Sequence, residues 1–208
     1  GTYMRVFIAI ACALAITSMP SEAKQALNFE ITPLIGYRFG GDFDTSKDEA
    51  HNRIELNEET SYGLLTAWSF DRNRQGEFLV SHYNTNFSSS DDFSASNTEL
   101  GITYAHIGGN VPVTEGPVPL YVTGGLGLTH LAPKGDGLSD ETRFSVNVGL
   151  ASKIQLSEHV SLRLDGRVYG TFFNSDSAIF CDAATCAIYI SSDIWVQSEV
   201  SVGISYRF

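Results

Sequence analysis

The chain ends in Glu199-Val-Ser-Val-Gly-Ile-Ser-Tyr-Arg-Phe208, a stretch in which apolar and polar side chains alternate. A period of two is typical of a β-strand with one apolar and one polar face. The alternation continues upstream through Val196 to Ile194, so the strand exceeds the about five or six residues usual in soluble sheets. A strand that crosses a bilayer needs about nine to eleven residues. The C-terminal segment therefore predicts a membrane-crossing strand.

The same alternation recurs along the chain and indicates about eight strands in all. The further segments are Phe29–Phe39, Tyr62–Phe70, Glu77–Phe87, Leu100–Tyr104, Leu120–Leu131, Phe144–Leu150 and Val160–Val168. The alternation is less regular in Glu77–Phe87 and in the Gly-rich Leu120–Leu131. These two segments leave about ten strands as an alternative.

The connections between the segments alternate in length. The links near Asp71–Gly76 and Gln155–Glu158 are short, and the link Gly108–Val118 carries Pro112 and Pro117. The other links are polar and mostly longer: Gly40–Glu59, Ser88–Ser96, Ala132–Asp140 and Asn174–Ala187. Short turns on one rim and long loops on the other are typical of outer-membrane barrels. The predicted fold is all-β, a transmembrane antiparallel up-and-down β-barrel.

The polar face of the strands carries charges of both signs, which indicates the lumen of a membrane barrel rather than the surface of a soluble one. The expected lumen charge cluster is Glu30, Glu99, Arg143, Arg163, Asp165, Arg167 and Glu199. The interior of an eight-strand barrel is just wide enough for side chains to fill. We therefore expect these charges to pair inside a filled barrel, in a structural role. By the same alternation, Leu100, Ile102 and Tyr104 are expected to face lipid.

The charge balance excludes one class of partner. The chain has 208 residues and a formal net charge of -11, from 13 Lys and Arg against 24 Asp and Glu. A nucleic-acid partner is not expected, because nucleic-acid binding needs a basic surface. Much of the acidity falls in the predicted long loops, at Asp42, Asp44, Asp48, Glu49, Glu55, Glu58, Glu59, Asp91, Asp92, Asp136, Asp140, Glu141, Asp176 and Asp182. Clustered carboxylates suit divalent cations, but no spacing matches a calcium loop. We expect a solvated acidic surface, with no metal or cofactor site.

The N-terminus has the form of a secretory signal peptide. Met4–Ala23 contains a weakly positive start, an uncharged apolar run and small residues before the expected cleavage after Ala23. Gly1–Tyr3 are interpreted as an upstream remnant, and residues 24–208 as one outer-membrane barrel domain. The alternatives are a short buried helix and lipidation at Cys12, although the apolar run continues past that cysteine.

Cleavage at this point leaves two cysteines, Cys181 and Cys186, in the spacing C-x4-C. One close pair in an exported chain indicates a disulfide. Metal binding is the alternative, but two thiols without a nearby His make a poor zinc site. We expect a structural disulfide.

Three stretches carry a resemblance to known proteins. The first is the ending Val202-x-Ile204-x-Tyr206-x-Phe208. It resembles the C-terminal signature of Gram-negative outer-membrane β-barrels, which implies recognition by the barrel-assembly machinery. Tyr121–Gly127 and Leu162–Arg167 are similar to strands of the small OmpA-like and OmpW-like barrel superfamily. The resemblance implies the outer membrane of a Gram-negative bacterium, contact with its lipid and lipopolysaccharide, and a monomer.

Two non-enzymatic functions are compatible with such a barrel. The first is a structural or surface-binding role, in which the barrel anchors and presents its loops. The second is a narrow channel for small or apolar compounds, which the OmpW-like resemblance implies. Leu34 and Leu65 on the expected inner face support the channel.

An enzyme acting on lipid A is a third hypothesis. The stretch His82-Tyr83-Asn84 resembles the His-x-Ser stretch of lipid A deacylases, with Asn84 in place of the nucleophilic serine. Ser81 lies next to His82, but neighbours on a strand point to opposite faces. We therefore do not expect an enzyme.

Overall fold

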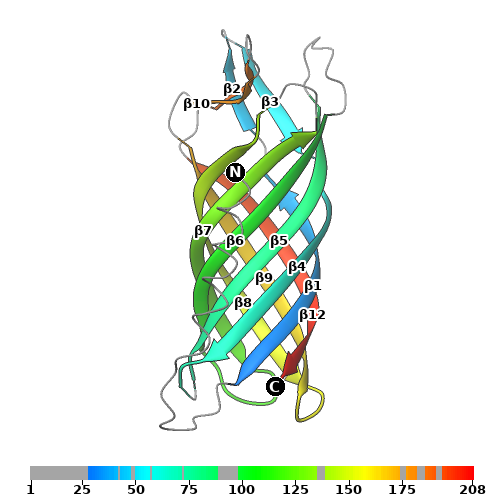
Figure 1. Ribbon diagram of the computed structural model, residues 1–208, viewed down its shortest axis with the longest axis vertical. Helices are drawn as coiled ribbons and strands as arrows, with labels where there is room; N and C mark the ends of the chain where they lie inside the picture. Colours follow the sequence, from blue (N-terminus) through cyan, green and yellow to red (C-terminus); the bar gives the residue numbers. More distant parts are fainter. Residues whose placement is uncertain are drawn as a thin grey trace, which may run out of the picture.

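The structure, a computed structural model, describes residues 28–41, 43–47, 50–56, 58–71, 73–88, 98–134, 139–173, 177–181, 186–190 and 194–208. Eight long strands close into a barrel in which each strand pairs antiparallel with the next and the last pairs with the first (Figure 1). They are β1 (Phe29–Gly40), β4 (Glu59–Ser69), β5 (Gln75–Ser88), β6 (Thr98–Pro112), β7 (Leu120–Lys134), β8 (Glu141–Gln155), β9 (Val160–Phe172) and β12 (Ile194–Arg207). The predicted all-β up-and-down barrel is confirmed.

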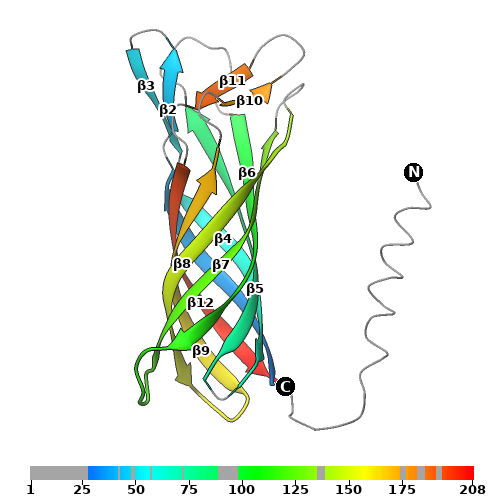
Figure 2. The same cartoon turned by 90° about the vertical axis from the view of Figure 1, so that its left-hand side faces the viewer.

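Four short strands rise above one end of the barrel, where the sequence predicted only long loops (Figure 2). They are β2 (Phe43–Lys47), β3 (Ala50–Leu56), β10 (Ser177–Cys181) and β11 (Cys186–Ile190). They form two hairpins, which meet where Ile190 pairs with Thr45. The barrel itself keeps eight strands, so the alternative of ten is wrong.

The two ends of the barrel differ as expected. The β4–β5, β6–β7 and β8–β9 connections lie at the end that holds the C-terminus (Figure 1). At this end Phe208 donates a backbone hydrogen bond to Phe29 at 2.9 Å. In outer-membrane barrels the short turns face the periplasm, so we assign this end to the periplasm and the other end to the cell surface.

The N-terminal part of the chain adds nothing to this assignment. Residues 1–27, with the predicted signal peptide and Cys12, lie outside the described residues. Among the described residues, no helix is long and apolar enough to cross a membrane.

The terminal strand β12 shows how the two faces divide. Val202 and Ile204 are exposed on the outer wall, whereas Glu199 and Ser205 are buried in the lumen. Exposed apolar side chains on the other strands include Ile35, Leu64, Phe78, Leu126, Val148 and Val168. An apolar wall around a polar interior is the arrangement of a membrane barrel. The expected orientation of the faces is confirmed for these strands other than β5, whose facing the sequence left open.

Aromatic side chains gather on the wall at the periplasmic end. Phe208 lies 6.3 Å from Phe29 and 5.0 Å from Tyr206 between ring centroids, and Trp68 lies 6.1 Å from Phe70. Such aromatic girdles mark the level of the membrane interface.

Strand β6 faces differently from the sequence-based expectation. Leu100, Ile102 and Tyr104 point into the lumen and are fully buried. Glu99 lies on the outer wall, where its carboxylate is 2.6 Å from Lys134 Nζ and both side chains are exposed. The error has a physical reason. Near the cell-surface end the lumen is apolar and the wall is polar, so polarity no longer identifies the face.

Candidate functional site

Buried charges fill the lumen, and the group nearest the periplasm is a rim pair formed by Glu30 on β1 and Lys153 on β8. Lys153 Nζ lies 2.9 Å from Glu30 Oε1, with both side chains buried. The same ammonium donates a hydrogen bond to Gln75 Oε1 on β5 at 2.8 Å. The rim pair therefore joins three strands around the base of the lumen.

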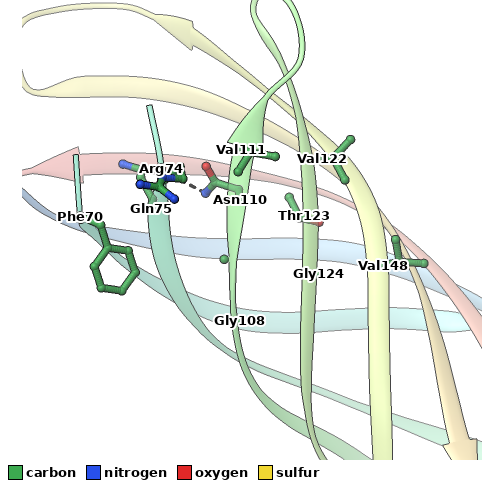
Figure 3. Close-up of a pocket in the computed structure, with 11 residues that line it drawn as sticks. Phe70, Arg74, Gln75, Gly108, Asn110, Val111, Val122, Thr123, Gly124 and Val148 are labelled. Carbon is green, nitrogen blue, oxygen red and sulfur yellow. Dashed lines mark hydrogen bonds between the residues drawn. The ribbon is translucent and has the colours of Figure 1, made fainter. Parts of the chain in front are cut away.

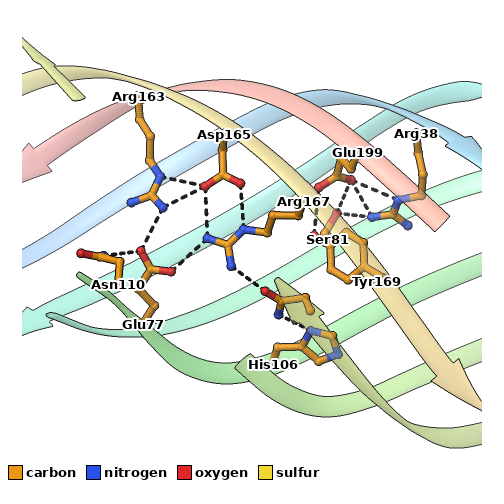
Figure 4. A network of polar contacts seen from close by, with 11 residues as sticks. Arg38, Glu77, Ser81, His106, Asn110, Arg163, Asp165, Arg167, Tyr169 and Glu199 are labelled. Carbon is orange, nitrogen blue, oxygen red and sulfur yellow. Dashed lines mark hydrogen bonds and ion pairs between the residues drawn. The ribbon is translucent and has the colours of Figure 1, made fainter. Parts of the chain in front are cut away.

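A central cluster lies above the rim pair and consists of Glu77 on β5 with Arg163, Asp165 and Arg167 on β9 (Figure 4). Glu77 uses both carboxylate oxygens, with Oε1 2.9 Å from Arg163 Nη2 and Oε2 2.9 Å from Arg167 Nη2. Asp165 accepts hydrogen bonds from both guanidinium groups at 2.8 Å. All four side chains are buried. Two carboxylates balance two guanidinium groups, so the cluster is electrically neutral.

The central cluster spans the full width of the lumen. Strands β5 and β9 are separated by three strands in either direction around the sheet, so they form opposite walls. Asn110 donates to Glu77 at 2.6 Å, and Arg167 donates to Asn147 at 3.0 Å. Asn147 Nδ2 is in turn 2.6 Å from a ring nitrogen of His106. These bonds make one continuous polar network across the barrel.

A third group, the Arg38 cluster, lies closer to the cell surface. The guanidinium carbon of Arg38 is 4.5 Å from the ring centroid of Tyr83, 4.8 Å from that of Tyr104 and 5.5 Å from that of Tyr169. Such cation–π contacts are strongest where water is excluded. Arg38 Nη2 also lies 2.7 Å from Glu199 Oε2. The positive charge is therefore held by a carboxylate and by three aromatic faces.

Hydroxyl groups complete the Arg38 cluster and tie it to several strands. Glu199 accepts hydrogen bonds from Ser81 at 2.9 Å and from Tyr169 at 3.1 Å (Figure 4). Tyr104 on β6 donates to Gln197 on β12 at 2.8 Å, again across the lumen. A buried charge is tolerated when it is paired and its remaining hydrogen-bonding groups are satisfied, and Glu199 meets both conditions.

The cell-surface end of the lumen has a different, apolar lining. Leu100, Ile102, Leu131, Phe173 and Trp195 are all buried there. Trp195 Nε1 donates to the backbone oxygen of Gly41 at 2.6 Å. This apolar mouth lies above the Arg38 cluster along β6, β7 and β12.

The predicted charge cluster is placed as follows. Glu30, Arg163, Asp165, Arg167 and Glu199 are buried in the lumen. Arg143 faces the lumen near the mouth, partly exposed, and pairs with Glu141 at 3.2 Å. Glu99 lies on the outer wall and takes no part. The residues that come together therefore form separate neutral groups, and Arg143 belongs to none of them.

Sequence reasoning missed three of the ionic partners, Arg38, Glu77 and Lys153. Arg38 follows Glu30 at an even spacing on the same strand, so the period of two contained the signal. Lys153 likewise keeps the alternation of Asn147 beyond the predicted end of β8. Glu77 gave no clear signal, because Phe78, Leu79 and Val80 follow it without alternation.

Three other candidate sites are a Ser81–His82 catalytic pair, the Cys181–Cys186 disulfide and a metal site. Ser81 faces the lumen and His82 the outer wall, so these two side chains form no catalytic pair. Cys181 and Cys186 are directly opposite each other in the β10–β11 hairpin. Their side chains lie outside the part that the structure describes, so the disulfide stays a prediction. Within the described residues, no group of three or more His, Cys, Asp or Glu side chains could hold a metal ion.

Side chains that are apolar on the outer wall and ionic in the enclosed lumen reverse the pattern of a soluble barrel, and this reversal defines a transmembrane β-barrel. The comparison with protein families agrees. The chain matches the outer membrane protein beta-barrel domain over residues 8–208, and it belongs to that family. No curated protein matches the chain.

Several solved outer-membrane proteins share the fold. OprG from Pseudomonas aeruginosa is 13% identical with a TM-score of 0.61, covering 88% of this chain and 96% of that one. Neisserial surface protein A is 12% identical with a TM-score of 0.55, covering 86% and 97%. AlkL, solved in lipid bilayers, is 16% identical with a TM-score of 0.53, covering 92% and 97%. Identities this low show the fold alone, and they confirm the resemblance to small outer-membrane barrels.

Proposed function

We propose that this protein is a sealed outer-membrane anchor that presents its long loops at the cell surface. The central cluster carries the proposal, because Glu77 on one wall binds Arg163 and Arg167 on the opposite wall. An ion moving along the lumen would have to separate these charges. Separation leaves an uncompensated buried charge, which costs about 3–5 kcal/mol.

The Arg38 cluster supports a second barrier in the same lumen. The rings of Tyr104 and Tyr169 stack at 4.2 Å between centroids, and Arg38 lies against both. The interior of an eight-strand barrel has little room beyond its own side chains. The two clusters lie at different levels, so a conducting path requires both to open.

Single-channel recording in planar bilayers tests the seal. The purified, heat-modifiable barrel is expected to give no stable current steps. Arg38→Ala alone should also stay silent, because the central cluster still closes the lumen. Arg38→Ala combined with Glu77→Ala opens both levels and should give current steps. Thr142→Ala, on the outer wall, serves as the matched control and should stay silent. Stable ohmic steps from the wild-type protein would overturn the proposal.

A narrow channel for apolar compounds is the second candidate, and the apolar mouth favours it. Leu100, Ile102, Leu131, Phe173 and Trp195 give the cell-surface end of the lumen an apolar lining, and because they are buried, an entering apolar molecule would have to push them apart. Uptake of an apolar fluorescent dye into cells that make the protein tests this role. A channel predicts faster dye uptake in these cells than in cells without the protein. Ile102→Glu, inside the lumen, should abolish this increase, whereas Ile107→Glu, on the outer wall, should not. That result would favour the channel over the anchor.

We also propose that the barrel-assembly machinery recognises the last strand. Val202, Ile204, Tyr206 and Phe208 all project from the outer wall and are exposed as one row. A pulse-chase experiment tests this role by measuring the rate at which newly made protein reaches the folded, heat-modifiable form. Phe208→Ser should slow assembly more than Phe29→Ser, since both remove an aromatic ring from the girdle but only Phe208 belongs to the signal. Equal rates would argue against the signal.

The barrel is proposed to act as a monomer surrounded by lipid and lipopolysaccharide. Closure of the sheet supports this, because every long barrel strand has partners on both sides within one chain. Sedimentation in detergent is expected to give one protein copy per micelle. The loops remain the proposed site of surface binding. Of their carboxylates, Asp140 is exposed and lies 3.7 Å from His130 Nε2.

A further inference from the structure

The apolar outer wall has a gap near the periplasmic end. Gly109 on β6 pairs with Gly124 on β7, and both positions face outward. Along the same strands, Ile107 and Leu126 on one side of the pair and Val111 on the other are exposed apolar side chains. Two adjacent strands therefore lack a side chain at the same level of the wall.

This gap is the floor of a notch with a volume of about 730 Å³. Its walls include Phe70 from the β4–β5 turn, Val111 on β6, Val122 on β7 and Val148 on β8. Figure 3 shows Phe70 and Val148 on opposite sides of the two glycine-bearing strands. Glycine backbone and apolar side chains thus make up much of the lining, with Arg74 at one edge, and the notch opens to the side of the barrel that faces the membrane.

The backbone explains only one of the two glycines. A Cβ atom at Gly109 would lie 2.6 Å from the backbone oxygen of Gln75, so that position excludes a side chain. A Cβ atom at Gly124 would meet only the backbone oxygen of Asn147, at 3.5 Å, which is an ordinary contact. A third glycine at this level, Gly76, is already covered by the indole of Trp68. The sheet therefore accepts a side chain at Gly124, and none is there.

We propose that the notch binds one acyl chain of a phospholipid from the periplasmic leaflet. The notch continues the apolar wall that contacts membrane hydrocarbon. An unfilled notch would forfeit the dispersion contacts of its lining atoms, and a flexible hydrocarbon chain can follow its shape. The short-turn end lies in the leaflet made of phospholipid, whereas lipopolysaccharide occupies the opposite leaflet.

Polar groups at the edge of the notch suit the rest of such a lipid. Arg74 lines the notch from the turn, and its guanidinium is 2.7 Å from the Asp71 carboxylate. Both side chains are well exposed, at the level of the aromatic girdle. A headgroup that carries both a phosphate and an amine can contact such an exposed ion pair on both charges. The inference concerns the outer wall and does not depend on whether the lumen conducts.

Photolabelling tests the proposal. The barrel is reconstituted in vesicles of phosphatidylethanolamine and phosphatidylglycerol with a trace of phosphatidylethanolamine that has a diazirine on its acyl chain. Cross-links mapped by mass spectrometry are expected to concentrate on the peptides that hold Gly109 and Gly124. Gly124→Leu fills the notch and should lower this labelling about tenfold, the change expected when roughly two methylene groups lose their contact. Ala105→Leu adds the same side chain elsewhere on the outer face of β6 and should leave it unchanged.

The remaining outcomes are equally decisive. Phe70→Ala removes one wall from a turn rather than from a strand, so it keeps the test valid if Gly124→Leu does not fold into the heat-modifiable form. It should lower the labelling as well. Cross-links spread evenly along the apolar wall, or unchanged in both variants, would overturn the proposal. Equal labelling of the notch by a lipid A with the same photoreactive chain would overturn the assignment to phospholipid.

Discussion

Below Arg38 the lumen is filled largely by paired charges, whereas above it the buried side chains are mainly apolar. The periplasmic half contains the rim pair and the central cluster, and Leu34, Leu65 and Leu79 are buried in the same half. The cell-surface half contains the apolar mouth. The barrel closes its interior by two different means, and each half has its own sensitivity to mutation.

The outer wall changes in the opposite sense along the same axis. Val80, Ala105, Leu128 and Phe144 form one apolar level across four neighbouring strands. The next level toward the cell surface is His82, Thr103, His130 and Thr142. His82 Nδ1 lies 2.7 Å from Thr103 Oγ1, and His130 Nδ1 lies 2.9 Å from Thr142 Oγ1. The wall thus turns polar where the strands leave the hydrocarbon, and the lumen turns apolar near the same level.

The largest expected effect comes from breaking the central cluster. Glu77→Ala leaves Arg163 and Arg167 without their opposite-wall partner and should lower the free energy of unfolding by about 3–5 kcal/mol. Glu99→Ala breaks an exposed pair on the outer wall and should cost about 1 kcal/mol or less. Urea unfolding of both variants in lipid vesicles, followed by tryptophan fluorescence, measures the difference. Similar losses would remove the distinction between the enclosed and the exposed ion pairs.

The apolar mouth should respond to a loss of packing. Ile102→Ala deletes a fully buried side chain and should lower the free energy of unfolding by about 2–3 kcal/mol. Ile107→Ala, on the same strand but facing lipid, should cost about 0.5 kcal/mol. The same unfolding assay compares the two. A larger loss of unfolding free energy for Ile107→Ala than for Ile102→Ala would instead support the sequence-based expectation that Ile102 faces lipid.

The β10–β11 hairpin should be held by a disulfide between Cys181 and Cys186. Closing so short a loop contributes about 2 kcal/mol by the loss of chain entropy. Alkylation without reductant should leave both cysteines unmodified in the intact mass, and Cys181→Ser should speed amide exchange in β10 and β11 without changing it in β8. Modification of both thiols in the oxidised protein would show that the bond is absent.

The smallest effect is expected at the β4–β5 turn. Asp71 accepts a backbone hydrogen bond from Asn73 and bonds from Arg74, which hold the pKa of its carboxyl below the ordinary value. Because the folded-state pKa is lowered, the stabilisation is present above the unfolded-state pKa and is lost as the pH falls through the folded-state value. Carbon-13 titration of the Asp71 carboxyl measures this pKa. Asp71→Asn should remove the pH dependence of the turn, and a carboxyl that titrates at its ordinary pKa would contradict the assignment.

The sequence predicted the existence of every long strand because the period of two persists wherever a strand separates lipid from a polar lumen. Alternation also put Arg163, Asp165, Arg167 and Glu199 on the polar face, and these side chains are buried in the lumen. It failed at Leu100 and Ile102, because near the cell-surface end the lumen is apolar and the outer wall is polar.

Partnerships inside the lumen were harder to predict than strands. Glu77 and Arg163 meet only because β5 and β9 are opposite walls, and no local pattern reports that distance. The box of tyrosines around Arg38 combines β1, β5, β6 and β9 in the same way. The two short hairpins pair neighbouring segments, and the Ile190–Thr45 and β3–β5 pairings join them to distant segments. The polar composition of these loops indicated neither kind of pairing.

The bridge between opposite walls has a consequence for biogenesis. Glu77 and Arg163 are 86 residues apart in the chain. Until both strands are in place, β9 holds two arginines with only one nearby carboxylate, and such unbalanced charge is costly inside a bilayer. A half-built sheet must therefore keep its concave side hydrated. We expect that water to leave as the walls that hold Glu77 and Arg163 come together.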